Sequence, residues 1–177
     1  MRLEETAEKS PPQDATRETR ELFVLSAGGQ FFAVRAEETD GVAEGLKPAP
    51  LPRAPSGVLG VVSVRGRMRT VLYLPALFTN EDGSQTNASE EASEETSEVT
   101  HAPRFVVSLR GDEQLALAAD EVEGVVTIEA DSLSTPDASD SPLSATLERD
   151  GRLIQILDAS RLFDAAMRGT ERRRPRA

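Results

Sequence analysis

The chain has 177 residues, a formal net charge of −11, no cysteine and one histidine, His101. This length allows one ordinary domain or two very small ones, and the composition excludes disulfide bonds, thiolate catalysis and multi-histidine metal sites, so we expect no cofactor. No stretch reaches the roughly 18–20 apolar residues of a membrane helix and no apolar leader is present, so we expect a cytoplasmic protein without membrane insertion.

Composition divides the chain into five segments. Residues 1–20 are rich in Glu, Thr and Pro without apolar periodicity, which predicts a disordered tail. Residues 21–78 form a first ordered unit. Residues 79–103 carry seven acids and no Lys or Arg, which predicts an acidic Ser/Glu/Thr-rich linker. Residues 104–167 form a second ordered unit, and residues 168–177 are a short basic tail.

The two ordered units resemble each other. "ELFVLSAGGQFFAVRAEETDGV" (21–42) aligns without a gap with "RFVVSLRGDEQLALAADEVEGV" (104–125), at an offset of 83 residues. "RGRMRTVLYLPALF" (65–78) aligns with "DGRLIQILDASRLF" (150–163), at an offset of 85. An internal repeat of this length implies two similar structural units.

Each unit is predicted to consist of short strands. In the first unit, residues 23–27 and 30–35 are strands joined by a two-residue turn at Gly28-Gly29. Residues 36–42 indicate either a short helix or an irregular strand. The prolines of residues 48–55 exclude a regular helix there and favour an extended edge segment.

The end of each unit is predicted to be a hairpin followed by a helix. Two strands, residues 58–64 and 68–74, turn at Arg65-Gly66-Arg67, and residues 75–78 have helical composition. The second unit repeats this pattern, with a first turn at residues 110–113 and a helix over 159–167. Short, evenly spaced strands of this kind favour small β-barrels and a mainly β fold.

The repeat assigns part of the basic cluster to the hairpin. Gly66 and Arg67 recur as Gly151 and Arg152 in the second unit. Glycine suits the positive φ of a tight turn. We therefore interpret Gly66 and Gly151 as structural turn residues, and Arg67 as part of the same architecture.

Two other arginines of this cluster do not recur. Asp150 stands opposite Arg65, and Ile154 stands opposite Arg69. A difference between two copies of one scaffold is where a function is expected. We predict that Arg65 contacts a partner.

Enzymes and nucleic-acid binders are disfavoured. The chain has no phosphate-binding or nucleophile-elbow motif, and His101 lies in the predicted linker, where no general base is held in place. The carboxylates at Asp120, Glu121 and Glu123 are interpreted as solvated surface charge. The first unit has a charge of only +1 and adjoins the acidic linker, which would repel phosphate. We expect an interaction module with no nucleic-acid partner and no small-molecule substrate.

With these motifs placed, the chain resembles the CheW-like coupling proteins of bacterial chemotaxis. Four stretches carry the resemblance in the right order: "LFVLSAGGQFFAV", "LPRAPSGVLGVVSVRGRMRTVLYLPALF", "LALAADEVEGVV" and "GRLIQILDASRLF". The second resembles the family pattern "P…hxGhhNhRGxhhPhhDL", in which h is apolar. The third has Asp120, Val122 and Val125 in register with the family's "GIxVDxVxxV" segment.

The resemblance implies two intertwined five-stranded β-barrels with short helices, and no catalysis. It implies an adaptor that couples a chemoreceptor signalling tip to the regulatory domain of a CheA-type histidine kinase. The arginine of the "hRG" motif matches Arg65 and is associated in the family with coupling.

The chain departs from the family pattern mainly in the first unit. Ser63, Thr70 and Tyr73 stand where Asn, Pro and Asp are usual, and the acidic residue of the "VxEI" segment is shifted or lost near Asp40 and Val42. We predict partner contacts at Arg65, Ser63, Tyr73, Val42 and Asp40. The alternative is a divergent adaptor that no longer couples the kinase in the standard way and recruits another signalling or motility protein, through the acidic linker.

Overall fold

The computed structural model describes residues 18–78, 102–111, 114–136 and 141–171, with side chains described as far as Met167. Most of the predicted tails and acidic linker, with His101, therefore lies outside the described residues. The elements are β1 (Thr19–Ala27), β2 (Gln30–Arg35), η1 (Ala36–Glu38, a 3₁₀ helix), β3 (Thr39–Glu44), β4 (Val58–Val64), β5 (Arg67–Leu72), α1 (Leu74–Phe78), β6 (Phe105–Leu109), β7 (Leu115–Ala119), β8 (Glu121–Glu129), η2 (Ala130–Ser132, a 3₁₀ helix), β9 (Leu143–Arg149), β10 (Arg152–Leu157) and α2 (Ala159–Glu171).

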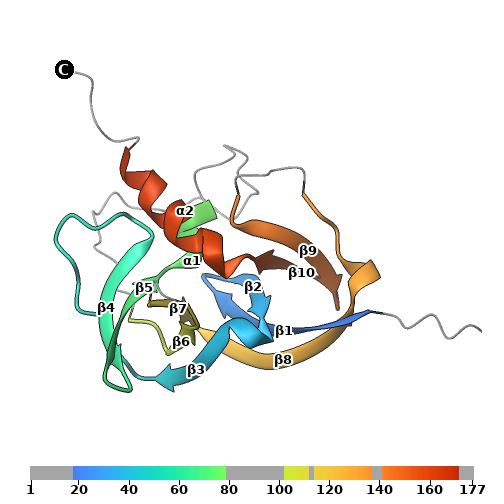
Figure 1. Cartoon of the computed structure of the whole chain (residues 1–177), viewed down its shortest axis with the longest axis horizontal. Helices are drawn as coiled ribbons and strands as arrows, with labels where there is room; N and C mark the ends of the chain where they lie inside the picture. Colours follow the sequence, from blue (N-terminus) through green and yellow to red (C-terminus); the bar gives the residue numbers. More distant parts are fainter. Residues whose placement is uncertain (1–17, 79–101, 112–113, 137–140, 172–177) are drawn as a thin grey trace, which may run out of the picture.

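The fold is mainly β, as predicted, and its strands form two five-stranded sheets (Figure 1). Sheet A has the order β8-β1-β2-β10-β9, and sheet B has the order β3-β6-β7-β5-β4. Neighbouring strands are antiparallel except for β2 with β10 and β5 with β7, which are parallel. Exchanging each strand for its counterpart in the other repeat converts one order into the other, so the internal repeat relates the two sheets.

Each sheet is built from both halves of the sequence. Sheet A joins the hairpin β1–β2 of the first repeat to β8, β9 and β10 of the second. Sheet B joins the hairpin β6–β7 of the second repeat to β3, β4 and β5 of the first. The two five-stranded units are therefore intertwined, as the family resemblance implies, and neither sheet coincides with residues 21–78 or 104–167.

Each sheet curls until its two ends meet at one bridge. Ala49, which follows β3, exchanges two backbone hydrogen bonds with Val61 of β4, at 2.8 and 2.9 Å. Ser134, which follows β8, does the same with Thr146 of β9, at 2.9 and 2.8 Å. Within the described residues no ladder joins β3 directly to β4 or β8 to β9, so the predicted barrels are curled sheets, each held shut by a single bridge.

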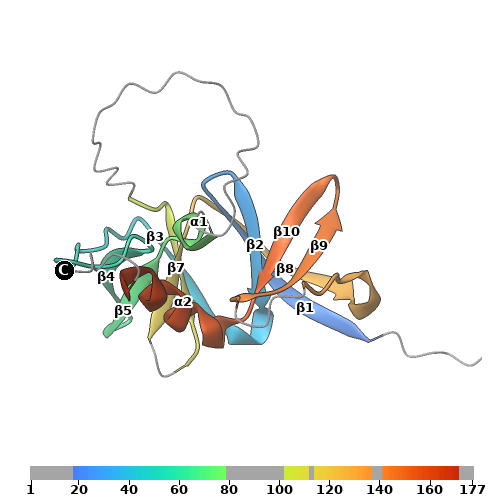
Figure 2. The same ribbon diagram turned by 90° about the horizontal axis from the view of Figure 1, so that it is seen from above.

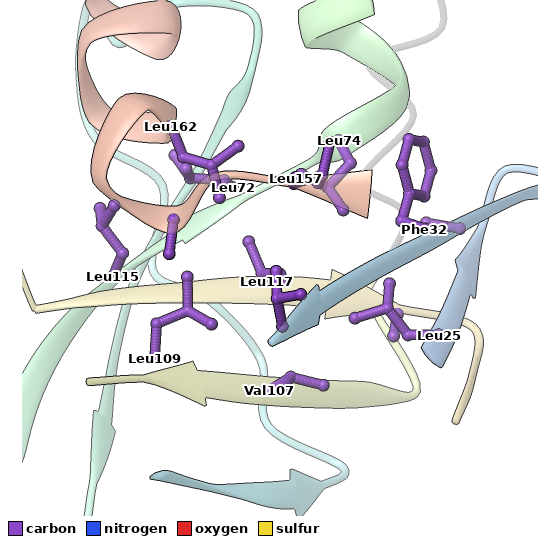
Figure 3. Close-up of a cluster of buried hydrophobic side chains, with 14 of the residues drawn as sticks. Leu25, Phe32, Leu72, Leu74, Val107, Leu109, Leu115, Leu117, Leu157 and Leu162 are labelled. Atoms are coloured by element: carbon purple, nitrogen blue, oxygen red, sulfur yellow. The ribbon is translucent and has the colours of Figure 1, made fainter. Parts of the chain in front are cut away.

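A central apolar cluster lies between the two sheets. Figure 3 shows side chains from both sheets converging there, including Leu25 and Phe32 of sheet A and Leu109 and Leu117 of sheet B, with Leu162 of α2. Burying a side chain of this size contributes about 1.5–3 kcal/mol. In Figure 2 the two sheets stand side by side, and α2 contributes Ala159, Leu162 and Ala166 to the cluster that they share, so this cluster fixes one sheet against the other.

Two smaller clusters fill the curled sheets themselves. The cluster inside sheet A consists of Leu22, Val24, Ala33, Ile128, Ala145, Leu147, Ile154 and Ile156. The cluster inside sheet B consists of Val62, Val71, Val106, Ala116 and Ala118. The residues inside sheet B are fewer and smaller, and this difference leaves room at one end of that sheet.

Several local predictions are resolved by the structure. Residues 36–42 are neither only a helix nor only a strand, because η1 is followed directly by β3. The first hairpin strand begins at Thr19, inside the segment predicted as a tail, and α2 continues to Glu171. The strand predicted to reach residue 74 ends at Leu72, because Leu74 starts α1. Neither helix in the described part of the chain is long and apolar enough to cross a membrane.

Candidate functional site

The β4–β5 hairpin turns through two residues, Arg65 and Gly66. Their φ angles are +51° and +78°, and Val64 pairs with Arg67 across the turn, so Arg67 belongs to β5 and not to the turn predicted at 65–67. Two successive positive φ angles are characteristic of a type I′ turn, which favours Asn, Asp or Gly at its first position. Arginine there costs roughly 1 kcal/mol. Arg65 is therefore held in a backbone conformation that asparagine, aspartate or glycine would adopt more easily.

The corresponding turn of sheet A has residue types that a type I′ turn favours. Asp150 and Gly151 take φ angles of +54° and +72° between β9 and β10. The two hairpins therefore have the same backbone, and aspartate occupies the position that Arg65 occupies in sheet B. Arginine is not required by the turn.

The Arg65 side chain extends from the turn to the edge strand β3. Its Nη1 donates a hydrogen bond to the backbone oxygen of Asp40 at 3.3 Å. A Cβ added to Gly41 would lie 3.2 Å from Arg65 Nη2, which is closer than most such contacts. The glycine at position 41 thus lets the guanidinium lie flat against β3.

A partly buried ion pair lies beside Arg65. The Arg69 side chain is only 5% exposed, and its Nη2 lies 2.7 Å from Asp40 Oδ2. Its Nη1 donates to the backbone oxygens of Leu109, at 2.6 Å, and Leu115, at 3.5 Å. Asp40 reaches Arg69 because it is the extra residue of a β-bulge in β3, where the register shifts between Thr39 and Gly41.

These residues line a cavity of about 480 Å³ between β3 and β4, which we call the β3–β4 cavity. Its lining consists of residues 40–43, Leu46, residues 63–65, Arg67, Arg69 and Ser108. Among the residues that the structure describes, Arg69 Nε and Ser108 Oγ are buried and find no hydrogen-bond partner. The cavity therefore combines an apolar wall with three arginines and one carboxylate.

Four of the five predicted contact residues come together at this cavity. Arg65, Ser63, Val42 and Asp40 all line it, although they come from the turn and from two different strands. Asp40 also pairs with Arg69, so its carboxylate is part of the wall.

Sequence reasoning missed Arg69 and Arg67 as lining residues. For Arg69 a signal was present, because an arginine stood where the other repeat has Ile154. For Arg67 the repeat suggested a structural role in the hairpin, because its counterpart Arg152 is also an arginine.

Tyr73, the fifth predicted residue, lies away from the cavity. Its hydroxyl is 2.7 Å from where a Cβ on Gly28 would stand, so it packs beside the β1–β2 turn. Its counterpart in the second repeat, Asp158, accepts a hydrogen bond from the Ser160 backbone N–H at 3.0 Å at the start of α2. A tyrosine cannot cap a helix in this way, so the substitution alters the contact between the sheets and the start of α1.

Glu38, in η1, has a pKa that is raised above the ordinary value for glutamate. Burial raises the pKa of Glu38, while the hydrogen bond from Arg35 N–H at 3.2 Å and the Arg35 charge lower it; the charges of Asp158 and Glu37 add to the increase. The net direction is upward. The folded protein therefore binds this proton more tightly than the unfolded chain does.

Replacing Glu38 with glutamine should raise the melting temperature at pH 7. A raised pKa in the folded state means that stability falls as pH rises through the titration of Glu38, so the penalty is fully present at neutral pH and absent when both states are protonated. Glutamine can still accept the Arg35 N–H. Thermal unfolding followed by circular dichroism at pH 7 and at pH 3.5, which lies below the ordinary glutamate pKa of 4.5, should show a gain only at pH 7. Glu37→Gln, which removes a neighbouring exposed charge, is the control; an equal gain in both variants would contradict this account.

No group of three or more His, Cys, Asp or Glu side chains in the described ranges is placed to hold a metal ion. What the β3–β4 cavity offers instead is arginine side chains and exposed apolar surface. Such a surface suits recognition of another molecule.

Comparison with known proteins identifies the fold. The family model of the CheW-like domain matches residues 21–167. Among solved structures, the chain is similar to scaffolding protein TtCheW from Thermoanaerobacter tengcongensis, with 16% sequence identity and a TM-score of 0.58 over 80% of this chain and 90% of that one. No curated protein matches the sequence.

Proposed function

Because the chain belongs to the family of CheW-like domains, we propose that it is a non-enzymatic adaptor that couples chemoreceptors to a CheA-type histidine kinase. The family match over residues 21–167 is the observation that carries this proposal. The partners proposed are the signalling tip of a chemoreceptor and the regulatory domain of the kinase. The place proposed is the cytoplasm, where these two partners would meet the chain.

Exposed apolar side chains at equivalent positions support docking by both units. In sheet B they are Val42 of β3 and Met68 of β5, and in sheet A they are Val125 of β8 and Leu153 of β10. Each pair occupies the same two positions of the repeat. An adaptor that contacts two partners needs two such surfaces, whereas a single binding site would leave one pair unexplained.

Arg65 supports a polar contact beside the apolar pair of sheet B. Its guanidinium crosses the β3–β4 cavity next to Val42, with Ser63 on the neighbouring strand. An arginine at the rim of an apolar patch can anchor a partner through hydrogen bonds and packing together. We propose Arg65, Ser63, Val42 and Asp40 as the contact group; Tyr73 would act only indirectly, through the contact between the sheets.

Arg65→Asp should weaken binding of one of the two partners at least about tenfold while keeping the melting temperature at or above that of the wild type. Aspartate occupies the same left-handed turn position at Asp150, so the substitution reverses the charge without straining the backbone. A loss of about tenfold corresponds to about 1.4 kcal/mol. Calorimetric titration with a purified kinase regulatory domain and with a receptor signalling fragment measures it.

The matched control is Arg149→Asp, which makes the same charge change beside the hairpin turn of sheet A. It should leave the contact made by sheet B unchanged. Wild-type protein that binds neither fragment would refute the adaptor proposal. Equal losses in both variants would show that overall charge, and not Arg65, governs binding.

A further inference from the structure

The two curled sheets differ in one feature that the repeat does not predict. Sheet A has a cavity at the position equivalent to the β3–β4 cavity, lined by Glu123 and Val126 of β8 and by residues of β9 and β10, but its volume is only about 100 Å³. The β3–β4 cavity of sheet B is about 480 Å³. The cavity is therefore nearly filled by side chains in sheet A and open in sheet B.

Side chains in sheet A satisfy one another and fill its cavity. Glu123 is the extra residue of a bulge in β8, and its Oε1 lies 2.9 Å from Arg152 Nη1. The Arg152 guanidinium also lies 4.8 Å from the centre of the Phe31 ring, a cation–π contact. Ile154 completes the apolar filling. Arg152 is thus engaged on two sides by its own chain.

Sheet B uses the same bulge for a different pairing. Asp40, the counterpart of Glu123, pairs with Arg69 and not with Arg67, although Arg67 is the counterpart of Arg152. Gln114 stands where sheet A has Phe31, so no aromatic ring covers the guanidinium. Among the residues that the structure describes, Arg67 has no hydrogen bond, ion pair or ring contact.

The open cavity is therefore rich in hydrogen-bond donors. Arg67 has no partner among the described residues, and Arg65 donates only to a backbone oxygen at 3.3 Å. Deeper in the wall, Arg69 and Ser108 are 5% and 2% exposed, and Arg69 Nε and Ser108 Oγ lack partners. Three guanidinium groups face a single carboxylate, that of Asp40, so the cavity has a net positive charge. Buried donors without acceptors are unfavourable unless a ligand satisfies them.

We propose that the β3–β4 cavity binds a carboxylate group, with Arg67 as its main ligand and Arg65 as the second. The planar fork of a guanidinium matches the two oxygens of a carboxylate. The Asp40 carboxylate in the wall favours a singly charged group over a doubly charged phosphate. The carboxylate belongs either to a small organic acid or to an Asp or Glu side chain of a protein. This ligand goes beyond the coupling function and is tested without any signalling partner.

The test is a titration of the full chain followed by NMR of the arginine Nε–H groups. The two probes are propionate, which has one carboxylate, and the peptide acetyl-Gly-Glu-Gly-amide, each compared with sodium chloride at equal ionic strength. Arg67→Gln removes the main ligand, and Arg152→Gln is its matched control at the equivalent position of sheet A. We expect saturable shifts that weaken by roughly tenfold or more in Arg67→Gln and stay unchanged in Arg152→Gln.

Each result decides the proposal. Saturation by propionate with this pattern supports a small organic acid as the ligand, and saturation by the peptide alone supports an acidic protein side chain. Shifts that sodium chloride reproduces, or that the two variants reduce equally, overturn the site, as does an absence of saturation with both probes.

Discussion

Asp40→Ala should lower the free energy of unfolding by about 2–3 kcal/mol, a large loss for a residue on an edge strand. The substitution leaves the Arg69 guanidinium without its 2.7 Å ion pair in a side chain that is only 5% exposed. Removing one partner of a buried pair costs more than the pair itself contributes, because an uncompensated charge stays in the interior. The Asp40 side chain is 38% exposed, which keeps the estimate below that for a fully buried pair. Urea unfolding followed by far-UV circular dichroism measures the loss.

The second repeat supplies the control for this prediction. Ile154 occupies the position of Arg69 inside sheet A, so isoleucine is compatible with the scaffold there. The double variant Asp40→Ala/Arg69→Ile removes the buried charge together with its partner and should regain most of the lost stability. A double variant that is as unstable as Asp40→Ala alone would show that Asp40 stabilises β3 in another way.

Gly60→Ala should destabilise the protein by about 3 kcal/mol. Gly60 has a φ angle of +146°, and a Cβ added there would lie 2.1 Å from the backbone oxygen of Ala49. The segment after β3 would have to move away from β4, which breaks the two hydrogen bonds between Ala49 and Val61. Loss of the single bridge should open sheet B, and faster amide hydrogen exchange at Val61 would report it.

Gly45→Ala separates the steric clash from the backbone conformation. Gly45 also has a positive φ angle, +72°, but nothing lies within 4 Å of a Cβ added to it. This variant should cost only about 1 kcal/mol and leave exchange at Val61 unchanged. If Gly60→Ala were no worse than Gly45→Ala, the close approach of Ala49 would not be what requires glycine at position 60.

Individual strands could be predicted where the residues within and beside them are enough to specify a strand. Residues 30–35 and 58–64 match β2 and β4 because runs of β-branched, aromatic and other apolar residues bounded by turn signals specify a strand without reference to distant residues. The aligned pairs of the repeat also match strand for strand. The prediction of two similar units of short strands followed from these local signals, and the number of five strands in each came from the family resemblance.

The pairing of strands across the repeats could not be read from the same signals. The hairpin β1–β2 would find similar apolar edges in either repeat, so its own sequence does not say that β2 pairs with β10 and not with β5. The expectation that the two units are intertwined came from the family resemblance and not from the periodicity of the strands.

The candidate site was predictable only in part, for a related reason. Arg65 stood out because the repeat lacks it, but the ion pair of Arg69 with Asp40 joins residues 29 positions apart through a bulge. Nothing in the local pattern of β3 marks where such a bulge falls. Arg67 lacks an ion-pair partner among the described residues because Asp40 pairs with Arg69. This feature could therefore be recognised only in the structure.

The exchange of hairpins between the two sheets also determines the order in which the sheets can form while the chain is being synthesised. Every strand of sheet B lies before residue 120, so this sheet can form while the ribosome is still adding the rest of the second repeat. The hairpin β1–β2, although made first, must wait for β10, which ends at Leu157. The edge of β2 stays unpaired until β10 is made, and unpaired strand edges are where chains aggregate. Among the described sheet edges, that of β2 therefore waits longest for its partner strand.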